Sequence, residues 1–411
     1  MKLVPVNDSV KEESGDIILC GFTEECDIYR FIVISILSLI AAIGLLSNGM
    51  LTWIFARYKC SNTPPTLYPT FLAILDGLIC FFYILLFGVD VVMGYLKIES
   101  LFVIYHTYIL PAFVLSKVTQ LAIPYLLIFV TLERYAWISP NLKNFCLFST
   151  MGRPISVICC LTVCAVLRSP PLWALTVETF KECPDFFRSL AVAPTEWVLD
   201  SQWYAFYDFW LMAFIQTFLP FFVLVSFNII IVKRLAAVHS SEKQQNAQAS
   251  PIPQSATNLL ATPPKGDSRV RQKRSFSRIR MPAAVRNAVY TTLAIVASYL
   301  ICNSLHLFLT ILERSKSSLL DDKEDPTKAS TFYTLLGDTV SALYCLSSAT
   351  RILIYCKCNP FVKAHVIRII GRQSEGKWLD YHEKNSFMTS SFSSLTIAKT
   401  NLGGEGESVD V

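Results

Sequence analysis

The triplet Glu133-Arg134-Tyr135 is the part of this sequence best suited to act through charge. It directly follows a long apolar segment, residues 110–132, so its guanidinium would lie at the edge of bilayer hydrocarbon. An arginine there must face protein or water, and a neighbouring carboxylate can hold it until another partner arrives. Such a pair would work as a switch. Alternatively, Arg134 and Tyr135 only anchor a helix end at the interface, so the surrounding elements must decide.

The composition is that of a protein that crosses a membrane several times. Of the 411 residues, 53% are hydrophobic and only 16% are charged, which excludes an ordinary soluble protein. A segment of about 20 apolar residues can cross the hydrocarbon. We therefore predict an all-α membrane protein, a bundle of seven transmembrane helices. The predicted spans are residues 29–55, 67–94, 108–138, 154–177, 204–235, 285–312 and 332–355.

Basic residues in the connections predict the orientation. Between residues 233 and 286 the chain carries eleven Lys and Arg residues against two acidic ones, and such an excess marks cytoplasmic loops. With seven crossings, the N-terminus is then extracellular, in a multi-pass protein of the plasma membrane. The N-terminal tail, residues 1–28, is acidic, and its Asn7 begins a glycosylation acceptor sequence.

Three cysteines fall in the predicted extracellular parts: Cys20, Cys26 and Cys183. Because this is an odd number for an oxidising compartment, one disulfide and one free thiol is the simplest expectation. The first apolar segment is long enough to span, so we expect it to direct insertion itself without a cleavable signal peptide.

The polar parts of the chain divide it further. Within the seven-span domain, residues 29–355, the connection 236–282 is too poor in apolar residues to fold alone and is predicted to be a flexible cytoplasmic loop. Its basic second half either binds anionic lipid or only sets the topology. Residues 356–372 alternate apolar and basic side chains, which is typical of a short amphipathic helix on the membrane surface. The tail, residues 373–411, is predicted to be a disordered cytoplasmic tail.

Polar residues and prolines inside the spans follow a familiar order. The first span contains Asn48, the second Asp76 and the fifth Pro220, while the third ends in Glu133-Arg134-Tyr135. This order resembles the rhodopsin-like (class A) family of G-protein-coupled receptors over nearly the whole apolar part. The resemblance implies that an extracellular agonist shifts an inactive–active equilibrium. Arg134 is then released from Glu133 and a heterotrimeric G protein binds. It implies no enzymatic activity, no cofactor or metal, and no nucleic-acid partner.

The later spans depart from the family pattern. The sixth reads Cys302-Asn303-Ser304-Leu305 where the family has Cys-Trp-x-Pro. The seventh reads Arg351-Ile352-Leu353-Ile354-Tyr355 where the family has Asn-Pro-x-x-Tyr, so Tyr355 is retained and joins the predicted coupling switch. Cys302-Asn303 followed by Leu312-Glu313, with Leu167-Arg168-Ser169-Pro170 in the fourth span, is similar to invertebrate FMRFamide-type neuropeptide receptors.

The resemblance places Asp76 opposite Arg351. In the family, the second-span aspartate faces the Asn-Pro region across a cavity that often holds sodium. Our hypothesis is that Arg351 takes the place of that cation, in a polar network with Asn48; alternatively, Arg351 snorkels to the interface. Cys183 lacks its usual family partner because Ile109 occupies the expected position, so we predict that it pairs with Cys20 or Cys26.

The ligand is predicted from charge. Acidic residues outnumber basic ones in the external segments, which favours a cationic ligand. The aspartate of amine receptors is replaced by Ser116, and residues 332–355 hold no lysine for retinal. A short peptide with an amidated aromatic-basic end is expected, and a chemosensory receptor for small molecules is the alternative. A transporter is a further class, but transporters tend to show internal repeats and broken spans, and we find neither in the sequence. The candidate ligand contacts are Ser116, Lys117, Gln120, Tyr207, His306 and Glu313.

Two predicted modifications concern the C-terminal part. Cys356 and Cys358 are palmitoylation candidates by position, although unmodified thiols would serve equally well. Serines and threonines are dense between Ser386 and Thr396. Phosphorylated there by receptor kinases, the tail would present negative charge to a basic partner such as arrestin.

Overall fold

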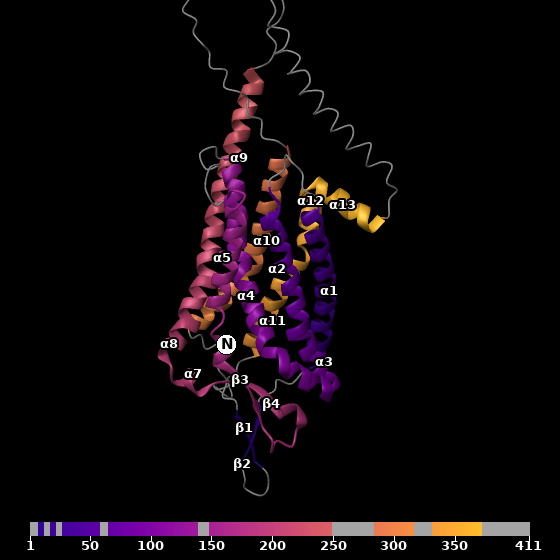
Figure 1. Ribbon diagram of the computed structural model, residues 1–411, viewed down its shortest axis with the longest axis vertical. Helices are drawn as coiled ribbons and strands as arrows, with labels where there is room; N and C mark the ends of the chain where they lie inside the picture. The colour runs from indigo at the N-terminus through magenta and orange to yellow at the C-terminus, as the bar shows by residue number, and fades with distance from the viewer. Residues whose placement is uncertain are drawn as a thin grey trace, which may run out of the picture. The chain divides into compact units, whose positions relative to one another are not determined.

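The computed structural model describes residues 7–11, 17–21, 27–57, 65–138, 148–248, 283–315 and 331–371. In this part of the chain, seven helices are long and apolar enough to cross a membrane (Figure 1). A short helix, α13 (Pro360–Gly371), follows the seventh. The predicted fold class is therefore confirmed. The seven spans are Ile28–Arg57, Leu67–Leu96, Glu99–Ile138, Gly152–Ala174, Gln202–Ala237, Val285–Glu313 and Phe332–Cys358.

Four of the spans consist of more than one helical element. The second joins α2 (Leu67–Tyr83), the π-helix η1 (Ile84–Gly88) and α3 (Val89–Leu96); the fourth joins α5 (Gly152–Leu167) and α6 (Pro171–Ala174). The fifth contains α8 (Gln202–Ala205), the π-helices η5 (Phe206–Leu211) and η6 (Phe214–Phe218), and α9 (Leu219–Gln248). The seventh is divided at Thr350 into α11 (Thr331–Ala349) and α12 (Arg351–Cys358). The other spans are formed by α1 (Ile28–Arg57), α4 (Glu99–Ile138) and α10 (Ala283–Arg314).

Most predicted span ends lie within a few residues of the observed ones, but the start of the third span and the end of the fifth helix differ more. Helix α4 begins at Glu99 rather than at residue 108, and α9 continues to Gln248 rather than ending at residue 235. The extension of α9 is polar, and that of α4 contains the run Tyr105-His106-Thr107, which lowers the hydropathy, so hydropathy alone does not reveal them. The fourth span ends at Ala174, because Leu175 begins a strand instead of continuing the helix. The start of the connection 236–282 is thus helical.

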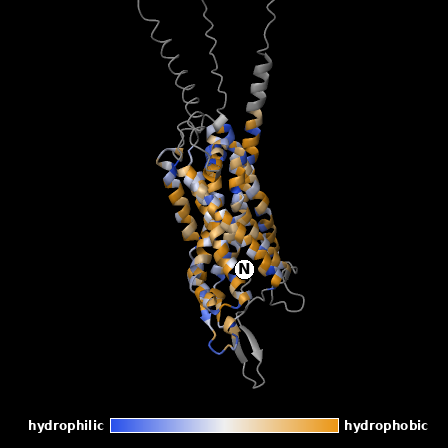
Figure 2. Ribbon diagram, turned by 90° about the vertical axis from the view of Figure 1, so that its right-hand side faces the viewer, coloured by the Kyte–Doolittle hydropathy of each residue, from blue (hydrophilic) through white to orange (hydrophobic). Residues whose placement is uncertain are grey.

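Helix α4 lies among the other helices. It contacts α2, α5, α9 and α10, while α1 packs against α2 and α11 on one side of the bundle. Many large apolar side chains are exposed on the outside of the helices, and Figure 2 shows hydrophobic residues along the length of the helices. Such an exterior suits a protein whose solvent is lipid.

Helix α1 lies very close to two neighbouring helices at Gly44. A Cβ added there would lie 2.7 Å from Cβ of Ala349 on α11 and 2.8 Å from Sγ of Cys80 on α2. These contacts are too short for real atoms, so only glycine allows this approach. Small residues permit such close packing between helices in membranes.

The π-helical turns are supported by tyrosines of α4. Tyr105 and Tyr108 donate hydrogen bonds to the carbonyls of Leu86 (3.2 Å) and Leu85 (3.1 Å) in η1. Tyr125 donates to the carbonyl of Ile215 in η6 (2.9 Å). A π-turn disturbs the regular helical hydrogen bonds, and in hydrocarbon each loosened carbonyl needs a partner within the protein. The three hydroxyls therefore stabilise η1 and η6 against α4.

Two antiparallel hairpins lie at one end of the bundle, which we call the hairpin end (Figure 1). Strand β1 (Asn7–Lys11) pairs with β2 (Ile17–Gly21), and β3 (Leu175–Thr179) pairs with β4 (Leu190–Pro194). They are joined by a disulfide between Cys20 and Cys183, and Arg188 Nε donates to the carbonyl of Gly21 (2.9 Å). The short elements η4 (Phe186–Arg188) and α7 (Glu196–Asp200) flank β4.

Candidate functional site

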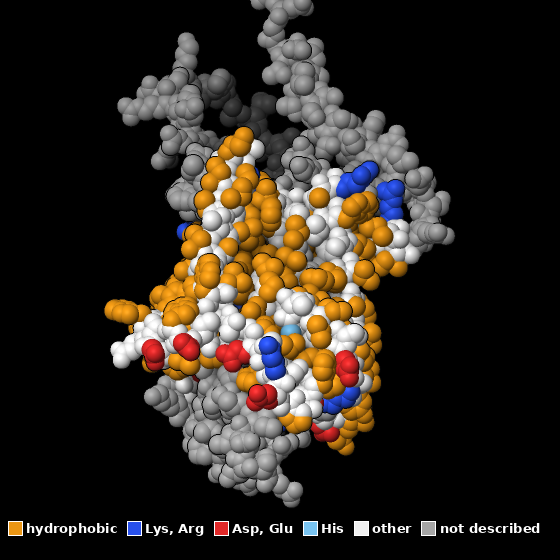
Figure 3. All heavy atoms as spheres, turned by 60° about the horizontal axis from the view of Figure 1, so that its bottom comes forward, with side chains coloured by type: hydrophobic (Ala, Val, Ile, Leu, Met, Phe, Trp, Pro, Cys, Tyr) orange, Lys and Arg blue, Asp and Glu red, His pale blue; other side chains and the backbone are white. Residues whose placement is uncertain are grey.

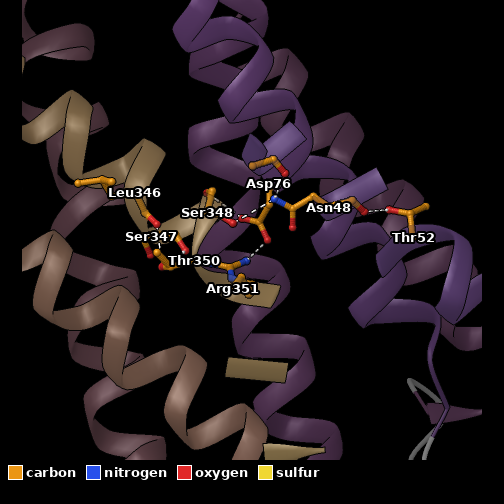
Figure 4. Close-up of polar contacts among 9 residues, drawn as sticks. Asn48, Thr52, Asp76, Leu346, Ser347, Ser348, Thr350 and Arg351 are labelled. Atoms are coloured by element: carbon orange, nitrogen blue, oxygen red, sulfur yellow. Dashed lines mark hydrogen bonds and ion pairs between the residues drawn. The ribbon is translucent and has the colours of Figure 1, made fainter. Parts of the chain in front are cut away.

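A buried ion pair lies between the second and seventh spans (Figure 4). Arg351 Nη1 donates to Asp76 Oδ2, and Ser348 Oγ donates to Asp76 Oδ1 (2.9 Å). Asp76 is 0% and Arg351 is 2% exposed. Asn48 Nδ2 donates to the carbonyls of Ser348 (3.0 Å) and Gly44 (2.9 Å), which ties the first span to this group. The structure therefore brings together Asn48, Asp76 and Arg351, and Arg351 points to the carboxylate rather than to the interface.

The break in the seventh span explains this position of Arg351. Thr350 separates α11 from α12, and its Oγ1 donates to the carbonyl of Leu346 (2.7 Å). Arg351 is the first residue of α12. Its side chain therefore lies inside the bundle, beside the buried side chains of Asp76 and Ser348.

At the end of the bundle opposite the hairpin end, Glu133 is shared by two arginines. Its Oε1 accepts a hydrogen bond from Arg153 Nε (2.7 Å), whereas its Oε2 is 3.9 Å from Arg134 Nη1. Glu133 and Arg134 are both buried. Among the described residues, Nε and Nη1 of Arg134 have no hydrogen-bond partner. Arg134 is therefore held weakly, and Glu133 is bound chiefly to Arg153 at the start of α5.

The aromatic members of the predicted switch pack beside this pair. Tyr135 packs on a cluster that includes Ile231 of α9 and Val289 of α10. Tyr355 is buried and meets the ring of Phe55 edge-on, with ring centroids 5.1 Å apart. The two tyrosines thus join the end of α4 to the fifth and sixth spans and the end of α12 to the first.

A cavity of about 890 Å³ lies among the third to seventh spans near the hairpin end. Residues of β3 and α7 contribute to its wall, so the second hairpin borders it. The face that the hairpin end presents carries both acidic and basic side chains among hydrophobic ones (Figure 3). The charged and strongly polar side chains that line the cavity include Lys117, Arg168, Asp208, Gln216, His306 and Glu313.

Three of the six predicted ligand contacts line this cavity: Lys117, His306 and Glu313. Ser116 is buried, and Gln120 Nε2 lies 3.5 Å from its hydroxyl. The hydroxyl of Tyr207 donates to the carbonyl of Leu167. Ser116, Gln120 and Tyr207 lie outside the cavity lining. Ligand contact by any of the six residues stays a prediction.

A chain of polar side chains occupies the region where the family has its tryptophan and proline. Tyr344 Oη donates to Asn303 Oδ1 (2.5 Å) and lies 2.9 Å from His306 Nδ1. His306 Nδ1 is in turn 3.5 Å from Thr217 Oγ1. Since His306 lines the cavity, these contacts connect its floor with the fifth, sixth and seventh spans.

Sequence reasoning missed Arg168, Asp208 and Gln216 at the cavity and Arg153 beside Glu133. A signal existed for Arg168, because it is an ionisable residue near the end of an apolar segment. Arg153 stands at the start of a span, where a basic residue ordinarily indicates only topology.

The remaining candidate residues concern the disulfide and the predicted modifications. Cys183 is bonded to Cys20, and Cys26 is outside the described residues. Asn7 begins β1, and Cys356 and Cys358 are at the end of α12. The segment from Ser386 to Thr396 is also outside the described residues. Glycosylation, palmitoylation and phosphorylation at these positions stay predictions.

Comparison with known proteins identifies the arrangement. A family model described as the 7 transmembrane receptor (rhodopsin family) matches residues 47–355, more than half of the chain. No match to a curated protein was found. The matched region begins next to Asn48 and ends at Tyr355, so it contains the buried ion pair, the Glu133-Arg134 pair and the cavity. The chain belongs to the rhodopsin family of seven-transmembrane receptors.

Proposed function

We propose that this receptor is activated by a short amidated neuropeptide that enters the cavity near the hairpin end. Receptors of the family bind extracellular ligands and signal through heterotrimeric G proteins. The observation that carries the proposal is the cavity itself: about 890 Å³ is in the upper range for ligand sites. Its wall combines aromatic rings, such as Phe206 and Trp210, with the carboxylates of Asp208 and Glu313. An aromatic-basic peptide end offers the complementary groups.

The proposed orientation places the hairpin end outside the cell. The disulfide between Cys20 and Cys183 lies at that end and suits an oxidising compartment. The basic segment between residues 233 and 286 joins the fifth and sixth spans at the other end and suits the cytoplasm. Glu133 and Arg134 then face the G protein.

A chemosensory receptor for small molecules is the second candidate. The aromatic part of the cavity wall, with Phe113, Phe206, Phe209 and Trp210, would also receive an apolar small molecule. Its charged residues favour the peptide, because burying unmatched charges around an apolar ligand is costly.

The two candidates are separated by a functional screen. Cells that express the full chain are challenged with a neuropeptide library and, separately, with odorants, while calcium and cyclic AMP are recorded. We expect a response to one or more peptides that disappears in cells expressing Arg134→Ala. Silence to every peptide, together with a response to odorants, would reverse the order of the candidates.

A separate prediction concerns Arg153. Because Arg153 binds Glu133 more closely than Arg134 does, Arg153→Gln should free the carboxylate to hold Arg134 and so favour the inactive state. An ion pair between exposed groups is worth about 0.2–1 kcal/mol. Because the side chain of Glu133 is only 1% exposed, the effect here should be no smaller, and basal activity should fall by roughly 1.4-fold to fivefold or more. The measurement is agonist-free nucleotide exchange on the G protein per receptor at the cell surface. Arg153→Lys, which keeps the charge, is the control, and a rise in basal activity of Arg153→Gln would contradict the mechanism.

A further inference from the structure

Two positively charged side chains face the cavity from the third and fourth spans. Lys117 is on α4, and Arg168 directly follows α5; both contribute to the cavity wall. Both line the same cavity, where the charge of Arg168 opposes that of Lys117, while the carboxylates of Asp208 and Glu313 favour it. A charged side chain within a membrane span is costly and marks a site that requires a partner.

Among the residues that the structure describes, Lys117 forms no ion pair, and Arg168 forms a single long one, with Asp208. The contact made by Lys117 Nζ is with the ring of Phe113, whose centroid is 5.3 Å away. Arg168 Nη1 is 3.9 Å from Asp208 Oδ1, and the side chain of Asp208 is 47% exposed. Arg168 itself is only 9% exposed, and its Nε has no hydrogen-bond partner among the described residues. The buried fork of Arg168 is therefore left with unused donors.

The second acidic group of the cavity is engaged elsewhere. Glu313 Oε1 accepts a hydrogen bond from the hydroxyl of Tyr333 (2.8 Å), near the end of α10. Of the two positive and two negative side chains of the cavity, only Arg168 and Asp208 form an ion pair in the described part of the chain, and that pair is long, at 3.9 Å. A ligand with separated charges of both signs would satisfy both groups.

We propose that Lys117 and Arg168 form a subsite for a carboxylate of the ligand. A guanidinium presents donors in a planar fork that matches the two oxygens of a carboxylate, and an ammonium adds a second charge-assisted hydrogen bond. Burial makes such bonds strong, and the unpartnered Nε of Arg168 is satisfied when the carboxylate arrives. Glu313 and Asp208 then receive the basic part of the same ligand.

This inference rests on the proposed function, since it concerns the ligand of the same cavity. It adds that an amidated peptide must carry its negative charge on an aspartate or glutamate side chain. A peptide with a free C-terminus would supply the carboxylate instead. The chemistry is shared by both sources, and matched probes distinguish them.

The test uses three probes on the purified full-length receptor. N-acetyl-glutamyl-phenylalaninamide carries a side-chain carboxylate, N-acetyl-glutaminyl-phenylalanine carries a terminal one, and N-acetyl-glutaminyl-phenylalaninamide carries none. Binding is measured by the rise of the thermal unfolding midpoint with probe concentration. We expect one or both acidic probes to bind at least about tenfold more tightly than the neutral probe, as the loss of a charge-assisted hydrogen bond would predict.

Variants of the cavity make the test specific. Lys117→Met and Arg168→Gln should each reduce the preference for the acidic probe by about tenfold. Arg168→Lys keeps the charge without the fork and shows whether the receptor tolerates change at this position. Asp208→Asn is the matched control, with the opposite expected effect. It removes a carboxylate that competes with the probe for Arg168, so the acidic probe should bind more tightly to this variant.

The neutral probe binding as tightly as both acidic probes would overturn the subsite, as would the absence of binding by all three. A preference for carboxylate that Lys117→Met and Arg168→Gln both leave unchanged would also overturn it, because the charge would then be recognised elsewhere. Failure of the proposed function is read separately, from the peptide and odorant screen. A receptor that selects the acidic probe but answers only odorants has the subsite without the peptide ligand.

Discussion

Replacing Arg134 with alanine should abolish G-protein activation while the receptor still reaches the cell surface. Arg134 is buried at the end of the bundle that we place in the cytoplasm, with Glu133 3.9 Å from its Nη1. In the active state we expect this guanidinium to leave Glu133 and to bind the G protein, and alanine has no donor to offer. The measurement is agonist-stimulated nucleotide exchange, normalised to receptor on the cell surface.

The matched control for this variant is Arg57→Ala. Arg57 is an exposed arginine at the same end of the bundle, and its contact is with the ring of Trp53, 6.0 Å from the guanidinium carbon. The Arg57→Ala receptor should signal normally. Full signalling by Arg134→Ala would show that the triplet is only a helix-end anchor.

Replacing Arg351 with methionine should destabilise the receptor by about 3–5 kcal/mol, because it leaves the carboxylate of Asp76 buried without its counter-ion. The double variant Asp76→Asn with Arg351→Met should recover most of this loss, since it removes both charges together. The thermal unfolding midpoint of the purified receptor measures both effects. A single variant as stable as the unchanged receptor would mean that the pair contributes nothing.

The same pair predicts how the receptor responds to sodium. We propose that Arg351 occupies the place of a bound cation, so agonist affinity of the unchanged receptor should be equal in sodium and choline buffers. In Arg351→Asn the carboxylate of Asp76 is open to a cation, and sodium should then weaken agonist binding and raise the unfolding midpoint. A strong effect of sodium on the unchanged receptor would contradict the proposal.

The seven spans could be predicted from the sequence because each is a long run of apolar residues, which the hydropathy along the chain reveals. The miss at the start of α4 has a physical reason: Tyr105, His106 and Thr107 are polar and lower the hydropathy, although the helix continues through them. Val177 was assigned to the fourth span because a strand beside a membrane helix is equally apolar. The π-helix η1 could not be predicted from its own residues. Its carbonyls are bound by the hydroxyls of Tyr105 and Tyr108, which belong to another helix, α4.

The candidate site was predictable at ionisable residues within the spans, because burying an unpaired charge there has a large free-energy cost. Asp76 and Arg351 are both ionisable within spans, so each requires a partner and few partners exist. The cavity is different, because its lining depends on how five spans, β3 and α7 meet. Lys117, His306 and Glu313 were predicted there, whereas Arg168 and Asp208 become neighbours only when the fourth and fifth spans pack together.

The close approach at Gly44 has a consequence for how relatives of this receptor vary. A side chain at this position would meet both Cβ and Cα of Ala349, so no single exchange of the neighbouring residue makes room for it. Along the same helix, Ile43 and Leu46 are 65% and 75% exposed and touch little of the protein. In descendants of one ancestral gene, position 44 should therefore remain glycine while positions 43 and 46 drift freely among apolar residues.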